Sequence, residues 1–230
     1  MVTDPPYGIA WATHGVSRTA FADRALGDFN GEHRDVESIR NDEDTRTRDE
    51  VIDLWGRNRP GIVFGSLLAP PPVGARHGAV YVKPLDAGSL SAFGKLRRDL
   101  EGIWFLGSRR DGWGEQVKSG RGLLPQNERP PSVMRSSVFA TRERLAGTSA
   151  GVAARAKHPH AKPLDVLQDL IVESVPNAAW VLADPFAGSG STLVAARNLG
   201  RRAVGVEIEE KYCEIIANHL AKQTLFEGVF

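Results

Sequence analysis

The sequence predicts an α/β fold, with a mostly parallel sheet, flanking helices and strands in permuted order. Three observations support this prediction. Short apolar segments alternate with helical patterns, a glycine-rich turn joins a strand to a helix at 184–192, and only one helical segment follows the next strand. A doubly wound sheet needs about five or six parallel strands. The remaining strands must therefore come from the chain before the glycine-rich turn.

The N-terminal half supplies one helix and three strands. Residues 9–48 are polar without a clear period, which predicts a long loop with at most one short helix. Asp49–Trp55 has a helical pattern that glycine and proline end. Gly61–Gly65 is short and apolar, as expected for a buried strand, and residues 79–83 and 102–107 are β-branched or aromatic and bounded by turn residues.

The C-terminal half alternates helices and strands. Apolar residues recur at helical spacing over 163–175, and Pro163 suits a first helical turn. A strand is expected at 180–184 and a helix at about 191–199 after the glycine-rich turn. The next strand covers 203–207 and the last helix 211–222.

Length and composition narrow the function classes. A chain of 230 residues can bury about 70% of its unfolded surface and needs no disulfide or structural metal to fold. Its single cysteine, Cys213, cannot form an internal disulfide, which fits a reducing compartment. No apolar run approaches the ~20 residues of a membrane helix, and the start lacks signal-peptide features. We expect a cytoplasmic protein without membrane or metal partners.

The formal net charge of +1 conceals two segments of opposite sign. Residues 28–53 hold ten acidic and four basic side chains, whereas residues 108–157 hold ten basic and four acidic ones. The segment 108–160 is predicted to be irregular. A basic segment interrupted by Gly and Pro suits a phosphate-contacting surface. A solvated loop with ordinary arginines is an equal alternative.

The glycine-rich turn at 184–192 is the first indication of chemistry. Gly188 and Gly190 allow a tight turn and close approach to a ligand, and the following helix N-terminus offers N–H groups to an anion. Glu207 ends the next strand, where its carboxylate can accept both hydroxyls of a ribose. A P-loop Lys is absent, and Leu193 stands where a dinucleotide fingerprint has its third glycine. A nucleoside that carries a carboxylate fits better than a pyrophosphate. A plain strand–helix turn with a capping serine is the alternative.

The second indication is the N-terminal motif Asp4-Pro-Pro-Tyr7. Asp4 and a carbonyl of the rigid Pro5–Pro6 pair can accept the two N–H groups of an exocyclic amino group, and Tyr7 can stack on the ring. A base in a duplex must be flipped to reach such a pocket. The alternative is a proline-rich terminal turn.

Together, these motifs resemble the β class of amino-group DNA methyltransferases, which place the DPPY motif before the glycine-rich motif and use S-adenosylmethionine. The resemblance covers most of the chain and is especially close to bacterial and phage members. Segments 61–65 and 103–107 match the strands that support DPPY, and His158-Pro-His-Ala-Lys-Pro163 resembles the family's HPxxKP segment, beside the methionine end of the cofactor. It implies a Rossmann-like S-adenosylmethionine-dependent methyltransferase fold in one domain over 1–230, with a small basic target-recognition insertion at about 108–150.

The resemblance also assigns roles. It implies catalytic residues Asp4, Pro5, Pro6 and Tyr7. It implies cofactor-binding residues Lys162, Pro163, Asp184, Pro185, Phe186, Ala187, Gly188, Ser189, Gly190 and Glu207. In the basic insertion, Arg109, Arg110 and Arg121 are the candidates for DNA phosphates.

The expected function is methylation of adenine N6 in double-stranded DNA, because the motif has Asp where N4-cytosine enzymes more often have Ser. Alternatives are N4-cytosine methylation, a degenerate DNA-binding homologue without turnover and, more distantly, a nucleotide-dependent oxidoreductase. A homodimer is an alternative to a monomer, and a restriction–modification role fits the family.

A few further residues have weaker assignments. Trp11, Trp55, Trp104 and Trp180 are expected in the core, whereas Trp113, in the basic segment, is a candidate contact for a base. Glu101 is expected just before a strand, either lining the target pocket or at the surface. His158 and His160 lack a further metal ligand nearby.

The sequence departs from the family at its start. Only Met1, Val2 and Thr3 precede Asp4, whereas family members usually have a longer segment with an acidic group near the cofactor adenine. Loss of one hydrogen-bonding partner typically costs about 1–3 kcal/mol. We therefore expect weaker S-adenosylmethionine binding than in a chain with that segment.

Overall fold

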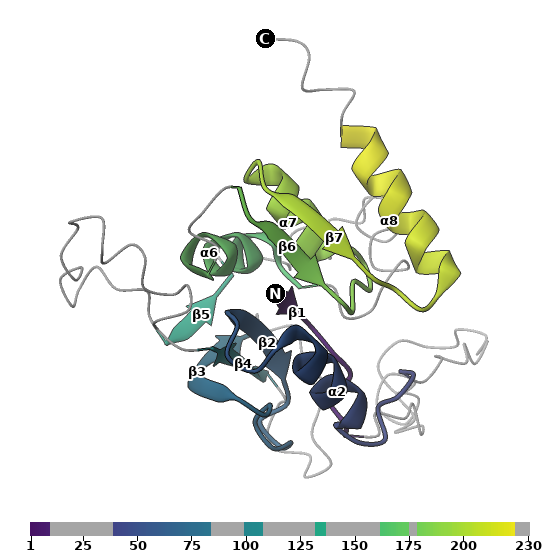
Figure 1. The fold of residues 1–230 in the computed structure, drawn as a ribbon. Helices are drawn as coiled ribbons and strands as arrows, with labels where there is room; N and C mark the ends of the chain where they lie inside the picture. Colours follow the sequence, from purple (N-terminus) through teal and green to yellow (C-terminus); the bar gives the residue numbers. More distant parts are fainter. Residues whose placement is uncertain (10–38, 84–98, 108–131, 137–161, 175–178, 224–230) are drawn as a thin grey trace, which may run out of the picture.

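The computed structural model describes residues 1–9, 39–83, 99–107, 132–136, 162–174 and 179–223. Figure 1 shows the arrangement of its helices and strands. The strands are β1 (Val2–Thr3), β2 (Gly61–Gly65), β3 (Ala75–Val82), β4 (Leu100–Leu106), β5 (Val133–Arg135), β6 (Val181–Asp184) and β7 (Arg202–Gly205). The helices are α2 (Arg46–Trp55), α6 (Leu164–Ser174), α7 (Ser191–Asn198) and α8 (Glu210–Gln223).

Two groups of strands form the sheet layer. One sheet has the order β1-β2-β4-β3-β5, and the other pairs β6 with β7 in parallel. Within the five-stranded sheet only β4 runs opposite to the rest, since it is antiparallel to both β2 and β3. β1 lies beside β6 (Figure 1) and contacts it. The first strand of the chain thus adjoins the pair formed near its end, which confirms the permuted order and the mainly parallel sheet.

Helices cover both faces of β2, which explains why all five of its residues are buried. Its side chains alternate between the two faces. Ile62 and Phe64 belong to the core cluster that includes Leu167 and Ile171 of α6. On the other face, Val63 belongs to the cluster that includes Ile52 of α2. The doubly wound arrangement therefore follows directly from an apolar strand with no polar face.

Most of the predicted elements are confirmed with small shifts. β2 matches the predicted strand, whereas α2 begins at Arg46 instead of Asp49 and β3 begins at Ala75 instead of Ala79. The prediction of irregular structure over 108–160 is wrong at 133–135, where β5 pairs in parallel with β3. Glu207 lies two residues beyond the end of β7 instead of in it. The predicted loop at 9–48 falls mainly outside the described residues.

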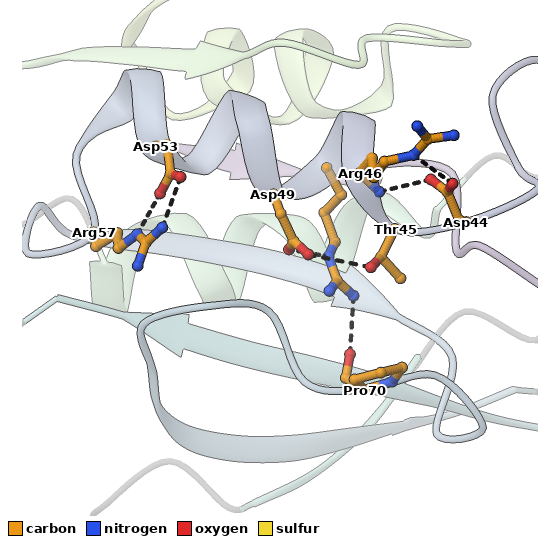
Figure 2. Close-up of polar contacts among 8 residues, drawn as sticks. Asp44, Thr45, Arg46, Asp49, Asp53, Arg57 and Pro70 are labelled. Atoms are coloured by element: carbon orange, nitrogen blue, oxygen red, sulfur yellow. Dashed lines mark hydrogen bonds and ion pairs between the residues drawn. The ribbon is translucent and has the colours of Figure 1, made fainter.

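Polar contacts fix the position of α2, as Figure 2 shows. Arg48 is almost fully buried. Its Nε donates to Asp49 Oδ1 at 2.9 Å, and its NH1 donates to the Pro70 carbonyl at 3.0 Å. Thr45 Oγ1 donates to Asp49 Oδ2 at 3.1 Å, just before the helix begins. These contacts explain why α2 begins three residues before its predicted start. Polar side chains stabilise its first turn, so the apolar pattern used for the prediction does not reveal it.

Residues 39–45, the bridging segment, connect the two ends of the chain. The buried Asp42 accepts the Gly8 N–H at 2.8 Å, and Arg40 forms an ion pair with Glu209. Gly8 has φ +67°, and a Cβ there would lie 2.6 Å from the carbonyl carbon of Asp44. Glycine is therefore needed directly after Asp4–Tyr7, both for its conformation and for space.

Gly8→Ala and Gly200→Ala make a matched pair. Both positions have positive φ, but nothing lies within 4 Å of a Cβ at Gly200. We expect Gly200→Ala to lower the free energy of unfolding by about 1 kcal/mol through backbone strain alone. Gly8→Ala should cost roughly 2–4 kcal/mol, since the backbone collision adds to the strain. Urea denaturation of the two variants measures the difference, and equal losses would contradict the contact between Gly8 and the bridging segment.

Candidate active site

A buried hydrogen bond brings the two predicted motifs together. Thr3 Oγ1, at the end of β1, donates to Asp184 Oδ1, at the end of β6, at 2.7 Å. Both residues are about 2% exposed. The Asp4–Tyr7 motif follows β1 and the glycine-rich turn follows β6, so both motifs leave the sheet at the same place. Thr3 was not among the predicted site residues, although its place before Asp4 at a strand end was a usable signal.

Asp184 holds the start of the glycine-rich turn. Its Oδ1 also accepts the Phe186 N–H at 3.2 Å, and its main-chain carbonyl accepts the Val206 N–H at 2.9 Å. Burial raises the pKa of Asp184 to about 6, while the hydrogen bonds from Thr3, Thr192 and Phe186 oppose that rise. The carboxyl therefore ties the turn to β1 at the cost of being hard to ionise.

The glycine-rich turn also positions Glu207. Gly188 N–H donates to Glu207 Oε2 at 2.7 Å, and Glu209 N–H donates to Oε1 at 2.9 Å. Each carboxylate oxygen retains a second acceptor site. The predicted ribose-binding group is thus fixed beside the turn, and it keeps the capacity to accept hydroxyl hydrogens.

Gly190 is required for packing as well as for turning. It is the N-cap of α7 with φ +79°, and a Cβ there would lie 2.8 Å from Cγ1 of Ile216 on α8. No side chain makes a capping hydrogen bond at this end of α7 in the described part of the chain, which disfavours the alternative of a capping serine. The first N–H groups of α7 therefore have no side-chain cap among the described residues.

The side chains of the Asp4–Tyr7 motif make internal contacts. Tyr7 Oη donates to Asp4 Oδ1 at 2.8 Å, and Lys162 Nζ pairs with Asp4 Oδ2. Pro5 is buried. Burial, followed by the nearby carboxylates of Asp4 and Glu101, raises the pKa of Tyr7 well above its usual value. Tyr7 is therefore a neutral hydrogen-bond donor, and Asp4 is held by partners on both oxygens.

Lys162 and Glu101 lie in the same cluster as Asp4. Lys162, predicted for the cofactor, has a side chain only 8% exposed and contacts Asp4, while its Nζ lies 3.4 Å from Glu101 Oε2. Lys83 Nζ lies 2.6 Å from Glu101 Oε1. Glu101 is within β4 and buried. Glu101 therefore does not precede the strand, as was expected, and it does not lie at the surface, which was one alternative. Its place beside Asp4 agrees with the other alternative, that Glu101 lines the target pocket.

Several predicted residues lie outside the described part of the chain. These are Arg109, Arg110, Arg121, Trp11, Trp113 and the segment His158–Ala161. The proposed insertion at about 108–150 is described only at 132–136, so its role stays a prediction. Trp55 and Trp180 are partly buried against core clusters.

Within the described residues no group of three or more His, Cys, Asp or Glu side chains is placed to hold a metal ion, and no helix has the length and apolarity to cross a membrane.

Comparison with known families identifies the class. A family model described as DNA methylase, of the N6/N4 type, matches residues 95–218. The chain therefore belongs to the amino-group DNA methylase family, which confirms the resemblance seen in its motifs.

Individual relatives match over shorter stretches. The Type II methyltransferase M2.DpnII of Streptococcus pneumoniae is 42% identical over 64 residues, which cover 28% of this chain and 24% of that protein. The putative methylase YubD of Escherichia coli K12 is 53% identical over 55 residues, 24% of each chain. The matched region thus spans about a quarter of the length of these relatives.

Solved structures share the fold over nearly the whole chain. M1.HpyAVI has a TM-score of 0.53 at 16% identity and covers 95% of this chain and 85% of its own. TTHA0409 of Thermus thermophilus, a putative DNA modification methylase solved with S-adenosyl-L-methionine, has a TM-score of 0.50 at 20% identity and covers 99% and 86%. These likenesses establish the fold, and they confirm the predicted fold class.

Asp184 should make stability depend on pH. Its pKa is raised from 3.8 to about 6 in the folded chain, so the folded state retains a proton that the unfolded state has lost. The unfolding free energy of the wild type, relative to Asp184→Asn, should therefore be highest below about pH 4 and fall by about 3 kcal/mol as the pH rises through about 6.

Denaturation at a series of pH values measures this difference. Asp53→Asn is a suitable control, because the pKa of the exposed Asp53 is lowered by its hydrogen bond with Arg57, and its difference from the wild type should change little over the same range. A constant difference between wild type and Asp184→Asn would contradict the prediction.

Proposed function

We propose that this protein transfers a methyl group from S-adenosylmethionine to an exocyclic amino group of a DNA base, and that the base is adenine, methylated at N6. The observation that carries the proposal is the Thr3–Asp184 hydrogen bond. It places a motif suited to an amino group next to a turn suited to a nucleoside. A methyl transfer needs its two reactants held in this way, because positioning supplies much of the rate.

The glycine-rich turn and its surroundings fit the proposed cofactor. Glu207, held by the Gly188 N–H, would accept the ribose hydroxyls, and the uncapped N–H groups of α7 favour the carboxylate of the methionine part. When bound, S-adenosylmethionine supplies an electrophilic methyl group. Phe186 and Pro163, both partly exposed, are proposed contacts. The other proposed contacts are Lys162, Asp184, Pro185, Ala187, Ser189 and Gly190.

Asp4 is proposed to hold the target amino group. Its two oxygens already accept from Tyr7 and pair with Lys162, so the carboxylate has a fixed orientation. A remaining acceptor site on Asp4 and a carbonyl of Pro5 or Pro6 would take the two amino hydrogens and direct the nitrogen lone pair outward. As the methyl group arrives, positive charge grows on that nitrogen, and the Asp4 carboxylate stabilises it. Tyr7 is proposed to stack on the flipped base.

The choice of adenine depends on the Asp in the motif. The family model covers both N6 and N4 methylases, so N4-cytosine is the second candidate. Digestion of methylated DNA to nucleosides, followed by mass spectrometry, separates the two products. The relatives named Type II methyltransferases support a role in restriction–modification, with double-stranded DNA as the partner.

Asp4→Ala tests the catalytic assignment. We expect methyl transfer from tritiated S-adenosylmethionine to unmethylated DNA to fall by at least about 100-fold, because a group that stabilises charge only in the transition state is lost. Cofactor binding, measured by calorimetry, should remain nearly unchanged. If binding and activity fall together, Asp4 belongs to the cofactor site instead. Turnover that is absent from the wild type as well would favour the degenerate homologue.

The proposed DNA contacts in the basic insertion predict a salt effect. Replacing Arg109, Arg110 and Arg121 with Gln should weaken DNA binding and reduce the slope of log K against log salt by roughly 0.9 per lost phosphate contact. Arg46→Gln with Arg57→Gln is the control, because each of these arginines pairs with a neighbouring aspartate (Figure 2). An unchanged slope in the triple variant would show that the DNA surface lies elsewhere.

A further inference from the structure

Four charged side chains from separate segments form a chain of ion pairs that ends at the proposed catalytic carboxylate, Asp4. Lys83 pairs with Glu101 at 2.6 Å, Glu101 lies 3.4 Å from Lys162, and Lys162 pairs with Asp4. The Glu101 and Lys162 side chains are 9% and 8% exposed, while those of Lys83 and Asp4 are 26% and 24% exposed. The buried middle of the chain thus joins two groups that reach solvent.

The signs in this ion-pair chain balance, with two carboxylates and two ammonium groups. A buried charge is costly unless it is paired. Burial lowers the pKa of Lys162, but Asp4 and Glu101 outweigh burial and leave it above its usual value. Burial raises the pKa of Glu101, but Lys162 and Lys83 outweigh burial and leave it below its usual value. Both buried members therefore remain ionised, and each depends on the other.

Glu101 bears on both partners of Asp4. Its Oε2 atom lies 3.4 Å from the Lys162 ammonium, at ion-pair distance. Its carboxylate also raises the pKa of Tyr7, after the larger effects of burial and of Asp4. The Lys162 ammonium lies 5.3 Å from the centroid of the Phe64 ring and 5.7 Å from that of Tyr7. The charged partners of this ammonium are Asp4 and Glu101, so Glu101 is its counter-charge besides Asp4.

We propose that Glu101 is a positioning residue for methyl transfer, which offsets the Lys162 ammonium so that Asp4 keeps its full negative charge for the target amino group. This inference depends on the proposed function. Without Glu101, Asp4 alone would balance Lys162, and the cluster at the reacting nitrogen would gain one positive charge. Positive charge grows on that nitrogen during methyl transfer, so the excess would oppose the reaction. The effect acts on the transition state more than on binding.

Glu101→Gln removes the charge and preserves the shape. We expect kcat to fall about tenfold or more, with little change in KM for DNA or in the calorimetric affinity for S-adenosylmethionine. Asp53→Asn is the matched control, since it makes the same change in an exposed ion pair with Arg57, and it should leave kcat unchanged. Full kcat in Glu101→Gln would overturn the inference and leave the proposed function intact.

A second variant distinguishes charge from structure. Glu101→Gln with Lys162→Met removes one charge of each sign, so at saturating S-adenosylmethionine its kcat should exceed that of Glu101→Gln alone. A residue with a merely structural role would not be rescued by this second change. A double variant no better than Glu101→Gln would overturn the inference, and thermal unfolding of each variant checks that it is folded.

A measurement without turnover completes the test. In NMR titrations of ¹³Cε-labelled lysine, Glu101→Gln should lower the pKa of Lys162, identified by its missing signal in Lys162→Met. An unchanged Lys162 pKa would overturn the inference whatever the activity. If the wild-type protein transfers no methyl group to DNA, the proposed function fails, and this titration still decides whether Glu101 sets the charge of Lys162.

Discussion

The hydrogen bond from Thr3 to Asp184 is the contact on which the site depends. It joins residues 181 positions apart in the chain, at 2.7 Å and away from water. A buried carboxyl without donors would cost several kcal/mol, so this hydrogen bond strongly favours one position of β1 beside β6. Since each strand ends at the bonded residue, the loops that follow must emerge together. One polar contact thus converts two separate motifs into one site.

Because the strand order is permuted, this contact must form between distant parts of the chain. β1, which leads into Asp4, is the first strand, and β6, which leads into the glycine-rich turn, comes near the other end of the chain. The two strands come together only after the intervening chain has folded back, so a long loop must close before the site can form. The bridging segment adds a second connection, because it contacts Gly8 at one end and Glu209 at the other. The site is therefore held by long-range contacts on two sides.

The sequence was sufficient for the elements that local pattern determines. The apolar run Gly61–Gly65 becomes β2 with the predicted bounds, and the turn at 184–190 joins β6 to α7 as expected. The antiparallel direction of β4 and the short β5 were not predicted, because pairing partners far apart in sequence set them. β5 has only three residues, Val133–Arg135, which is too short for a periodic pattern, and it is recognised as a strand only by its pairing with β3.

The candidate site divides in the same way. Asp4, Tyr7 and the glycine-rich turn belong to contiguous motifs, so sequence alone could select them. Asp42 is one of ten acidic residues in its segment, and nothing local distinguishes the one that receives the Gly8 N–H. Lys162 belongs to a motif but contacts Asp4, 158 residues away. That contact depends on how α6 packs on β2, which the motif does not encode.

Two buried acids of the site show how neighbours decide charge. Asp184 and Glu101 are both almost inaccessible to water, and burial alone would keep both protonated. Asp184 is offered hydroxyl and N–H groups, which reduce the effect of burial only partly, so its pKa remains near 6. Glu101 is offered two ammonium groups, which reverse the effect and bring its pKa below its usual range. The two acids thus have different roles: Asp184 binds β1 to β6, and Glu101 carries a negative charge that two ammonium groups stabilise. The charge of Glu101 acts on Lys162 and Asp4, where the proposed reaction needs it. Under mildly acidic conditions Asp184 is largely protonated and adds no second fixed charge between β1 and β6.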